Sequence, residues 1–154
     1  KGYEVKIVTD KRGKKFITEN LNLQLFVLNT ETPFNKEYLK KIYSYLKIFI
    51  SIFKSLFFLI KEKPNLVLGL GGYASFPLCL ATKLLNISLV LYENNTVLGR
   101  TNSYLLPFAK KILIANDKIY NFPEKYKKKI TIVDHILRKN IFKYSKKNLV
   151  KKKY

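Results

Sequence analysis

Methionine and tryptophan are absent from this 154-residue chain, and cysteine and histidine occur once each. The single cysteine, Cys79, excludes an internal disulfide and is typical of a reducing compartment. Because leucines flank it, we expect it to be a buried core residue. The single histidine, His135, excludes a multi-histidine metal site and a local catalytic triad. We therefore expect no metal site and no cofactor.

Acidic residues and arginines are also scarce. Ten Asp or Glu stand against 30 Lys or Arg, which gives a formal charge of +20, and three of the basic residues are arginines: Arg12, Arg100 and Arg138. Two explanations of the lysine excess stay open: compositional drift on a solvated surface, or attraction to phosphates and anionic lipid. Bases are read mainly by bidentate arginine, so we expect no nucleic-acid partner.

No apolar run reaches the ~20 residues that a transmembrane helix needs. The longest apolar segment, residues 37–60, has helical periodicity and is interrupted by Lys47 and Lys54. One interpretation is an ordinary buried helix whose lysines reach water. The other is a membrane-docking helix, with Lys47 and Lys54 at lipid phosphates and Phe57 and Phe58 in the acyl boundary.

Strand-like and helix-like segments alternate along the chain. The strand-like runs lie at residues 4–9, 23–28, 66–68, 88–92, 112–115 and 130–133, and the helical patterns at 38–60, 77–85 and 99–109. This alternation predicts an α/β fold, a Rossmann-like parallel sheet with helices on both faces. We expect the domain to occupy residues 1–140 and a basic linker to occupy residues 141–154. Because residue 1 is not methionine, we also expect a longer polypeptide.

A glycine-rich loop follows the strand-like run at residues 66–68 and opens the next helix. Its sequence is Gly69-Leu70-Gly71-Gly72-Tyr73-Ala74-Ser75. Glycine permits positive φ and close approach to the backbone, and N–H groups at a helix start attract anions. Gly-Xaa-Gly-Gly alone is a weak signal, which the strand before it and the helix after it strengthen. The loop predicts a phosphate-binding site; the alternative for Tyr73 is a ring packed over the turn.

Polar residues end the next strand-like run, at residues 88–92. They are Glu93, Asn94 and Asn95. Because carboxyl ends of parallel strands share one edge of a sheet, we expect this cluster to lie beside the glycine loop. The alternative for Glu93 is a carboxylate held by nearby backbone N–H groups.

Three segments together resemble the MurG family of bacterial cell-wall transferases. Residues 69–77 resemble its second glycine-rich loop, 92–102 its His-Glu-Gln-Asn segment, and 133–138 its Gly-Asn-Pro-Val-Arg segment. The family has a two-domain GT-B fold and transfers N-acetylglucosamine from UDP-N-acetylglucosamine to lipid-linked MurNAc-pentapeptide. The resemblance implies the N-terminal, acceptor-side domain without its first strand-helix unit. The C-terminal domain would bind most of the donor, so residues 1–154 alone are not expected to catalyse sugar transfer.

The resemblance also implies residue roles. Four loop residues would hold the diphosphate of the undecaprenyl-linked acceptor: Gly71, Gly72, Tyr73 and Ser75. Asn95 and Arg138 would contact the donor, and Glu93 would be a catalytic base or an orienting group. A lipid acceptor implies a peripheral enzyme on the cytoplasmic face of the bacterial inner membrane. The anionic membrane surface is then a partner, and the 37–60 helix is its docking face.

A glycogen- or nucleoside-type GT-B enzyme of other specificity stays open, since fold does not fix substrate. Two further functions also stay open. One is the membrane-side subunit of a two-chain UDP-N-acetylglucosamine transferase of the dolichol-pathway type. The other is a non-catalytic basic module that binds anions or membranes by charge alone. That module predicts a steep salt dependence and indifference to mutation of Gly72 or Asn95.

Overall fold

The computed structural model describes residues 2–17, 24–30, 37–116 and 118–134. The first half contains β1 (Lys6–Thr9), α1 (Lys11–Lys14), β2 (Gln24–Val27), α2 (Tyr38–Glu62) and β3 (Leu66–Gly69). The second half contains α3 (Phe76–Leu84), β4 (Ser88–Glu93), α4 (Arg100–Leu105), β5 (Lys111–Ile114), the 3₁₀ helix η1 (Glu124–Lys129) and β6 (Ile130–Ile132). The helix expected at 99–109 ends early, because Pro107 has no N–H to continue it. Arg138 and the expected linker at 141–154 lie outside the described residues.

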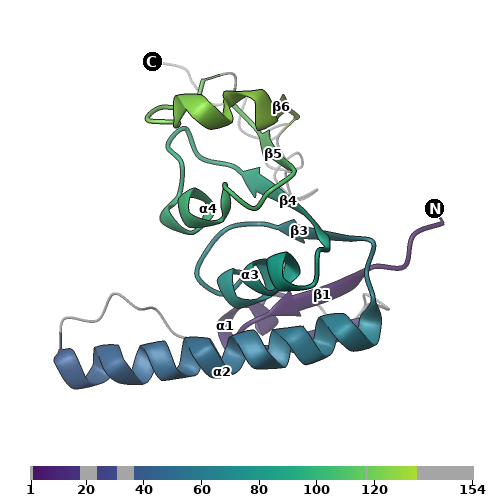
Figure 1. Cartoon of the computed structure of the whole chain (residues 1–154), viewed down its shortest axis with the longest axis vertical. Helices are drawn as coiled ribbons and strands as arrows, with labels where there is room; N and C mark the ends of the chain where they lie inside the picture. The colour runs from purple at the N-terminus through teal and green to yellow at the C-terminus, as the bar shows by residue number, and fades with distance from the viewer. Residues whose placement is uncertain (1, 18–23, 31–36, 117, 135–154) are drawn as a thin grey trace, which may run out of the picture.

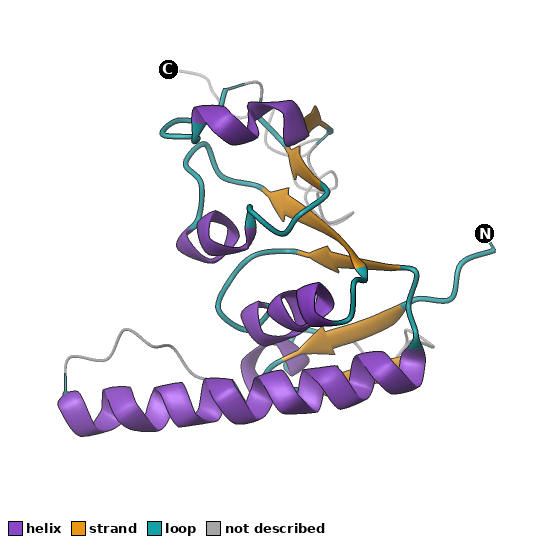
Figure 2. Cartoon of the chain, in the orientation of Figure 1, coloured by secondary structure: helices purple, strands orange, loops and turns teal. Residues whose placement is uncertain are grey.

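All pairings between the described strands are parallel, and Figure 2 shows the strand arrows with the helices around them. One sheet has the order β3-β4-β5-β6, and β1 and β2 form a second, two-stranded sheet. In Figure 1, α3 lies in front of β3 and α2 runs along the lower edge of the molecule. The α/β Rossmann-like prediction is confirmed, with the difference that the described strands form two sheets.

The packing of α3 against the larger sheet sets the position of the glycine loop. Most core residues come from β3, β4, β5, α3 and α4, with Leu59 from α2, and Cys79 of α3 is buried in the core as predicted. A Cβ on Gly69 would lie 2.7 Å from Cys79 Sγ and 3.0 Å from Leu91 Cδ2. No side chain fits there, so the end of β3 and the start of α3 are held at a fixed separation.

Helix α2 lies against the domain with its small polar side chains inward. Its buried residues are Ser44, Ser51, Ser55 and Leu59. Ser51 Oγ donates a hydrogen bond to Asn29 O at 3.0 Å. Many large apolar residues on the other side of the helix are exposed, among them Leu39, Ile42, Leu46, Phe49, Ile50, Phe53, Phe57 and Ile60. The interpretation of an ordinary buried helix is therefore wrong.

Two contacts attach α2 to the smaller sheet. Phe58 stacks on Phe26 of β2, with ring centroids 4.5 Å apart, and Lys6 of β1 pairs with Glu62 at the end of the helix. The hydrogen bond from Lys6 to Glu62, followed by the one to Glu4, raises the pKa of Lys6. Because Phe58 packs inside the domain, the expectation that it docks on a membrane is corrected.

By length and composition alone, α2 is a candidate membrane span, despite the lysines that led us to expect otherwise. About a fifth of its most apolar window, 22%, is buried inside the domain. The choice between spanning a membrane and lying on it therefore rests on how α2 is attached to the domain.

We predict that Cys79 is unreactive in the folded chain. Burial raises the pKa of its thiol to about 12, against a weaker lowering by the hydrogen bond with Ser75. At pH 8 an unfolded thiol with the ordinary value of 9.0 is roughly one-tenth thiolate, which is the reactive form. A disulfide reagent should modify Cys79 at once in urea and very slowly in buffer. Fast native-state modification would contradict the packing of α3.

Candidate functional site

The glycine loop makes a tight turn that opens toward solvent. Gly71 and Gly72 have φ angles of +78° and +73°, a region that other residues rarely adopt. Ser75 Oγ donates to the carbonyl oxygens of both glycines at 3.0 Å, and Ser75 N donates to Gly72 O at 3.2 Å. A Cβ on Gly72 would meet no atom within 4 Å. The Ser75 hydroxyl thus shapes the turn and leaves the space around Gly72 open.

The amides at the tip of this loop are available as donors. Within the described residues, the N–H groups of Gly72, Tyr73 and Ala74 donate to no backbone oxygen, whereas the next two amides bond within the turn. Consecutive N–H groups in such a turn form an anion-binding concavity. The loop therefore supplies backbone donors of the kind that a phosphate requires.

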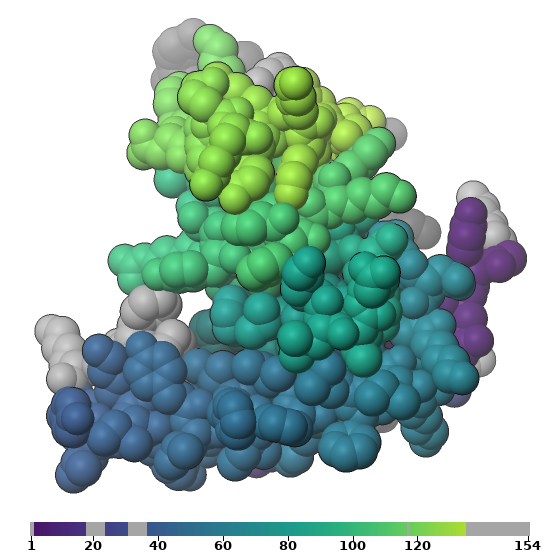
Figure 3. Space-filling model, in the orientation of Figure 1, coloured from purple at the N-terminus to yellow at the C-terminus, as the bar shows by residue number. Residues whose placement is uncertain are grey.

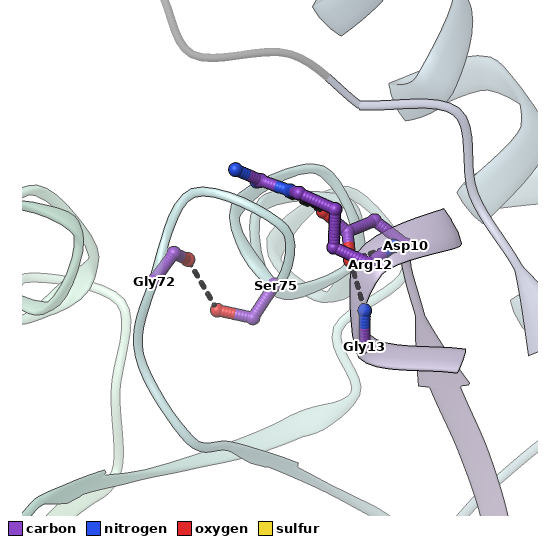
Figure 4. Close-up of polar contacts among 5 residues, drawn as sticks. All are labelled: Asp10, Arg12, Gly13, Gly72 and Ser75. Atoms are coloured by element: carbon purple, nitrogen blue, oxygen red, sulfur yellow. Dashed lines mark hydrogen bonds and ion pairs between the residues drawn. The ribbon is translucent and has the colours of Figure 1, made fainter. Parts of the chain in front are cut away.

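A charged pair from the end of β1 lies against the same loop (Figure 4). Asp10 Oδ1 accepts from the amides of Arg12 and Gly13, at 3.1 and 2.7 Å. Asp10 Oδ2 accepts from Nε and Nη2 of Arg12, both at 3.0 Å. The Arg12 guanidinium lies 4.3 Å from the centroid of the Tyr73 ring. The Tyr73 ring is thus part of a contact between the β1 end and the glycine loop.

The Asp10 carboxylate is buried, with 5% of the residue exposed. Its burial alone would raise the pKa, but the hydrogen bond from Gly13 and the bond and charge of Arg12 lower it below the ordinary value. Asp10 therefore stays ionised and holds Arg12 in place. Neither Asp10 nor Arg12 was predicted to have a role from the sequence. The available signal was an Asp directly after a strand with a Gly three residues on, which is typical of a capped turn.

Glu93 is the anchor of the strand-end cluster. It is 3% exposed, and its two oxygens accept four hydrogen bonds. Oε1 accepts from Asn95 N at 3.1 Å and Asn95 Nδ2 at 2.8 Å. Oε2 accepts from Gly99 N at 2.8 Å and Asn102 Nδ2 at 2.9 Å. A carboxylate engaged in this way orients its neighbours, and it is poorly placed to take a proton from a substrate.

Asn102 connects this cluster to the glycine loop. The residue is 1% exposed, and Nδ2 also donates to Tyr92 O at 3.0 Å. A Cβ on Gly71 would lie 3.4 Å from Asn102 Nδ2, so the loop backbone passes directly over this side chain. Its Oδ1 has no partner among the described residues. Sequence reasoning gave Asn102 no role, although it stands three residues after Gly99 in the segment that was recognised.

The structure thus brings together most of the predicted site residues. Gly71 lies close to Asn102, Asn102 donates a hydrogen bond to Glu93, and Glu93 accepts one from the exposed Asn95. The strand ends therefore meet as the parallel sheet predicted. Two predicted residues of the docking helix, Lys54 and Phe57, are exposed on α2, away from this cluster. Lys47 lies over the Tyr43 ring, 4.4 Å from its centroid.

The chain was compared with protein-family models and with curated proteins. A model described as the glycosyltransferase family 28 N-terminal domain matches residues 1–114. A Pelagibacter ubique protein named UDP-N-acetylglucosamine–N-acetylmuramyl-(pentapeptide) pyrophosphoryl-undecaprenol N-acetylglucosamine transferase is 38% identical over 141 residues, 91% of this chain and 39% of that protein. The Rickettsia canadensis protein of the same name is 33% identical over 142 residues, 92% and 38% of the two chains. The chain thus spans about two-fifths of these relatives.

Among solved structures, the crystal structure of Acinetobacter baumannii MurG is similar, with a TM-score of 0.70 and 23% identity. The match covers 88% of this chain and 38% of that one. At this identity the likeness establishes the fold.

We predict that Glu93→Ala lowers the free energy of unfolding by about 2–4 kcal/mol. The change removes both acceptors of four hydrogen bonds and leaves the buried amide of Asn102 with Tyr92 O alone. Urea unfolding followed by circular dichroism measures this. Glu124→Ala is the control, because its pair with Lys127 is exposed and contributes little. An equal urea midpoint for the two variants would contradict the anchoring role.

Proposed function

Because this chain belongs to the glycosyltransferase family 28 N-terminal domain family, we propose that it is the acceptor-binding part of a sugar transferase. The reaction is the one named for its relatives: N-acetylglucosamine moves from its UDP carrier to the MurNAc-pentapeptide of a pyrophosphoryl-undecaprenol acceptor. The observation that carries the proposal is the junction of the open glycine loop with the Glu93 cluster through Asn102. A purely electrostatic module has no need of that junction.

In this proposal the loop binds the diphosphate of the acceptor. The amides of Gly72, Tyr73 and Ala74 are the donors, and the lack of a side chain on Gly72 admits the phosphate. Ser75 supports the site by closing the turn through its hydroxyl. Its predicted role as a direct ligand becomes a role in shaping the loop.

The Glu93 cluster then faces the reacting sugars. A hydroxyl of the acceptor sugar attacks the anomeric carbon of the donor, a base takes the hydroxyl proton, and UDP leaves. Glu93 is a positioning residue in this scheme, because its oxygens already accept four hydrogen bonds. It fixes Asn95 for contact with the donor. Arg138, beyond the described residues, is proposed to offset the charge of the departing UDP.

The exposed apolar face of α2 is proposed to lie on an anionic membrane, where the acceptor is embedded. Figure 3 shows the helix forming the lower surface of the molecule. A shallow hollow on the helix is lined by Ile42, Tyr45, Leu46, Ile48, Phe49 and Ile52. Lys54 and Phe57, which is 74% exposed, belong to this surface. With a formal charge of +20, the chain is attracted to the cytoplasmic leaflet.

A docked helix fits the attachments of α2 better than a membrane-spanning one. Its serines pack on the domain, Phe58 stacks on Phe26, and Glu62 pairs with Lys6. Spanning the bilayer would break all of these contacts and move Ser44, Ser51 and Ser55 into lipid. Lying on the surface leaves them intact and buries only the outward apolar face.

We predict acceptor-dependent binding. The chain should sediment with vesicles that carry undecaprenyl-diphosphate MurNAc-pentapeptide about tenfold more tightly than with vesicles of equal charge that lack it. Gly72→Ala should remove most of this difference, because its methyl group fills the space at the loop, while costing about 1 kcal/mol of stability. Lys125→Gln, on the distant η1, is the control. Equal binding to both vesicles would support a basic module, and sugar transfer by residues 1–154 alone would contradict an acceptor-only role.

We also predict that α2 carries membrane affinity. Each basic residue near an anionic surface contributes about 1 kcal/mol, so Lys47→Glu/Lys54→Glu should weaken binding to phosphatidylglycerol vesicles by more than about tenfold. Phe53→Ser/Phe57→Ser should weaken vesicle binding at low and at high salt, because salt screens charges and leaves apolar contacts in place. The matched control is Lys125→Glu/Lys128→Glu on η1, at the opposite end of the molecule in Figure 1.

If Lys47→Glu/Lys54→Glu and Phe53→Ser/Phe57→Ser bind vesicles as tightly as the wild type and the control variant do, docking through α2 is contradicted. Alkaline carbonate distinguishes the two membrane modes: it should release a docked chain from the vesicles and would leave a spanning one in the pellet.

A further inference from the structure

Arg12 reaches the glycine loop from a different part of the chain. It follows β1, whereas the loop follows β3, and the two meet where its guanidinium lies over the Tyr73 ring at 4.3 Å. In Figure 4 the Arg12 side chain extends over the turn that carries Gly72 and Ser75. The guanidinium therefore lies beside the loop that carries the open amides.

The side chain of Arg12 is held on one edge and open on the other. Asp10 Oδ2 accepts from Nε and Nη2, which engages two of the five N–H donors of a guanidinium. Within the described residues, no bond from Nη1 is recorded, and the side chain is 65% exposed. The edge formed by Nη1 and Nη2 is a planar pair of donors, the geometry that matches phosphate oxygens.

The placement of Arg12 is fixed before any ligand arrives. The buried Asp10 is itself held by the amides of Arg12 and Gly13, so its carboxylate cannot turn away. The Tyr73 ring, with its centroid 4.3 Å from the guanidinium carbon, gives the side chain a second contact. A long side chain ordered in this way loses less entropy on binding than a free surface lysine does.

We propose that Arg12 is a binding residue for the diphosphate of the acceptor, which it contacts through its Nη1–Nη2 edge while the loop amides contact the neighbouring oxygens. This inference rests on the proposed function of the glycine loop and adds a side-chain ligand to it. Asp10 cancels part of the arginine's charge, so the contribution comes mainly from directed hydrogen bonds. A second phosphate group gives that edge further oxygens to bind.

The test uses the whole chain and three soluble probes in isothermal titration: geranyl diphosphate, geranyl monophosphate and UDP. Arg12→Gln should weaken geranyl diphosphate about tenfold and the monophosphate less, because charge-assisted bonds to the second phosphate are lost. Arg12→Lys should weaken it about threefold, since a lysine keeps the charge without the planar edge. Lys11→Gln is the matched control, because it removes the same charge one residue away.

Circular dichroism melting checks that each variant folds. We expect Arg12→Gln to fold, because Asp10 keeps its two backbone donors. A measurement on the wild type needs no variant: the Nη resonances of ¹⁵N-labelled Arg12 should shift as geranyl diphosphate is added. An unshifted signal at saturation would overturn the proposal.

The outcomes distinguish the proposed function of the glycine loop from the proposed role of Arg12. If Gly72→Ala weakens geranyl diphosphate and Arg12→Gln does not, the glycine-loop function stands and the role of Arg12 is wrong. If the wild type binds the two geranyl phosphates equally and Gly72→Ala changes nothing, the loop function fails, and the role of Arg12 fails with it. An equal loss of UDP binding in Arg12→Gln would assign Arg12 to the donor and overturn the proposal.

Discussion

The geometry of the site depends on one buried carboxylate. Removing Glu93 from water carries a desolvation cost of several kcal/mol unless hydrogen bonds replace the lost hydration. Four donors do so here, and they come from the residues that follow β4 and from α4. The segment after β4 is thereby tied to the helix that follows it. Asn102, which belongs to this network, also lies close to Gly71, where an added Cβ would come within 3.4 Å of its Nδ2, so the network borders the glycine loop.

The orientation of α2 is the second constraint on this molecule. A helix normally buries its apolar stripe, whereas here three serines share the buried positions with Leu59, and many large apolar residues are exposed. Small side chains let the helix approach the domain closely, and their hydroxyls bond to backbone carbonyls such as Asn29 O. The exposed apolar residues of α2 can therefore contact another apolar phase. The membrane proposal follows from this inversion more than from the net charge, which drift in composition also explains.

Local signals in the sequence were enough to predict the fold and part of the site. Alternating strand and helix patterns predicted the parallel α/β arrangement, and glycines between a strand and a helix predicted the open turn. Contacts between distant segments left no such signal. The contact of Arg12 with the Tyr73 ring depends on how β1 and β3 are placed, and hydrophobic periodicity carries no information on that placement. For the same reason Phe58 was assigned to the wrong face of α2, because its partner Phe26 lies on another strand.

The outward apolar face of α2 also affects how this chain behaves in a test tube. Two copies can bury the exposed apolar faces of their α2 helices against each other, a contact that involves no biological recognition. Self-association that grows with protein concentration and disappears in mild detergent would have this origin. Crystallisation and storage of the chain are then best attempted with an amphiphile present, which takes the place of the second copy.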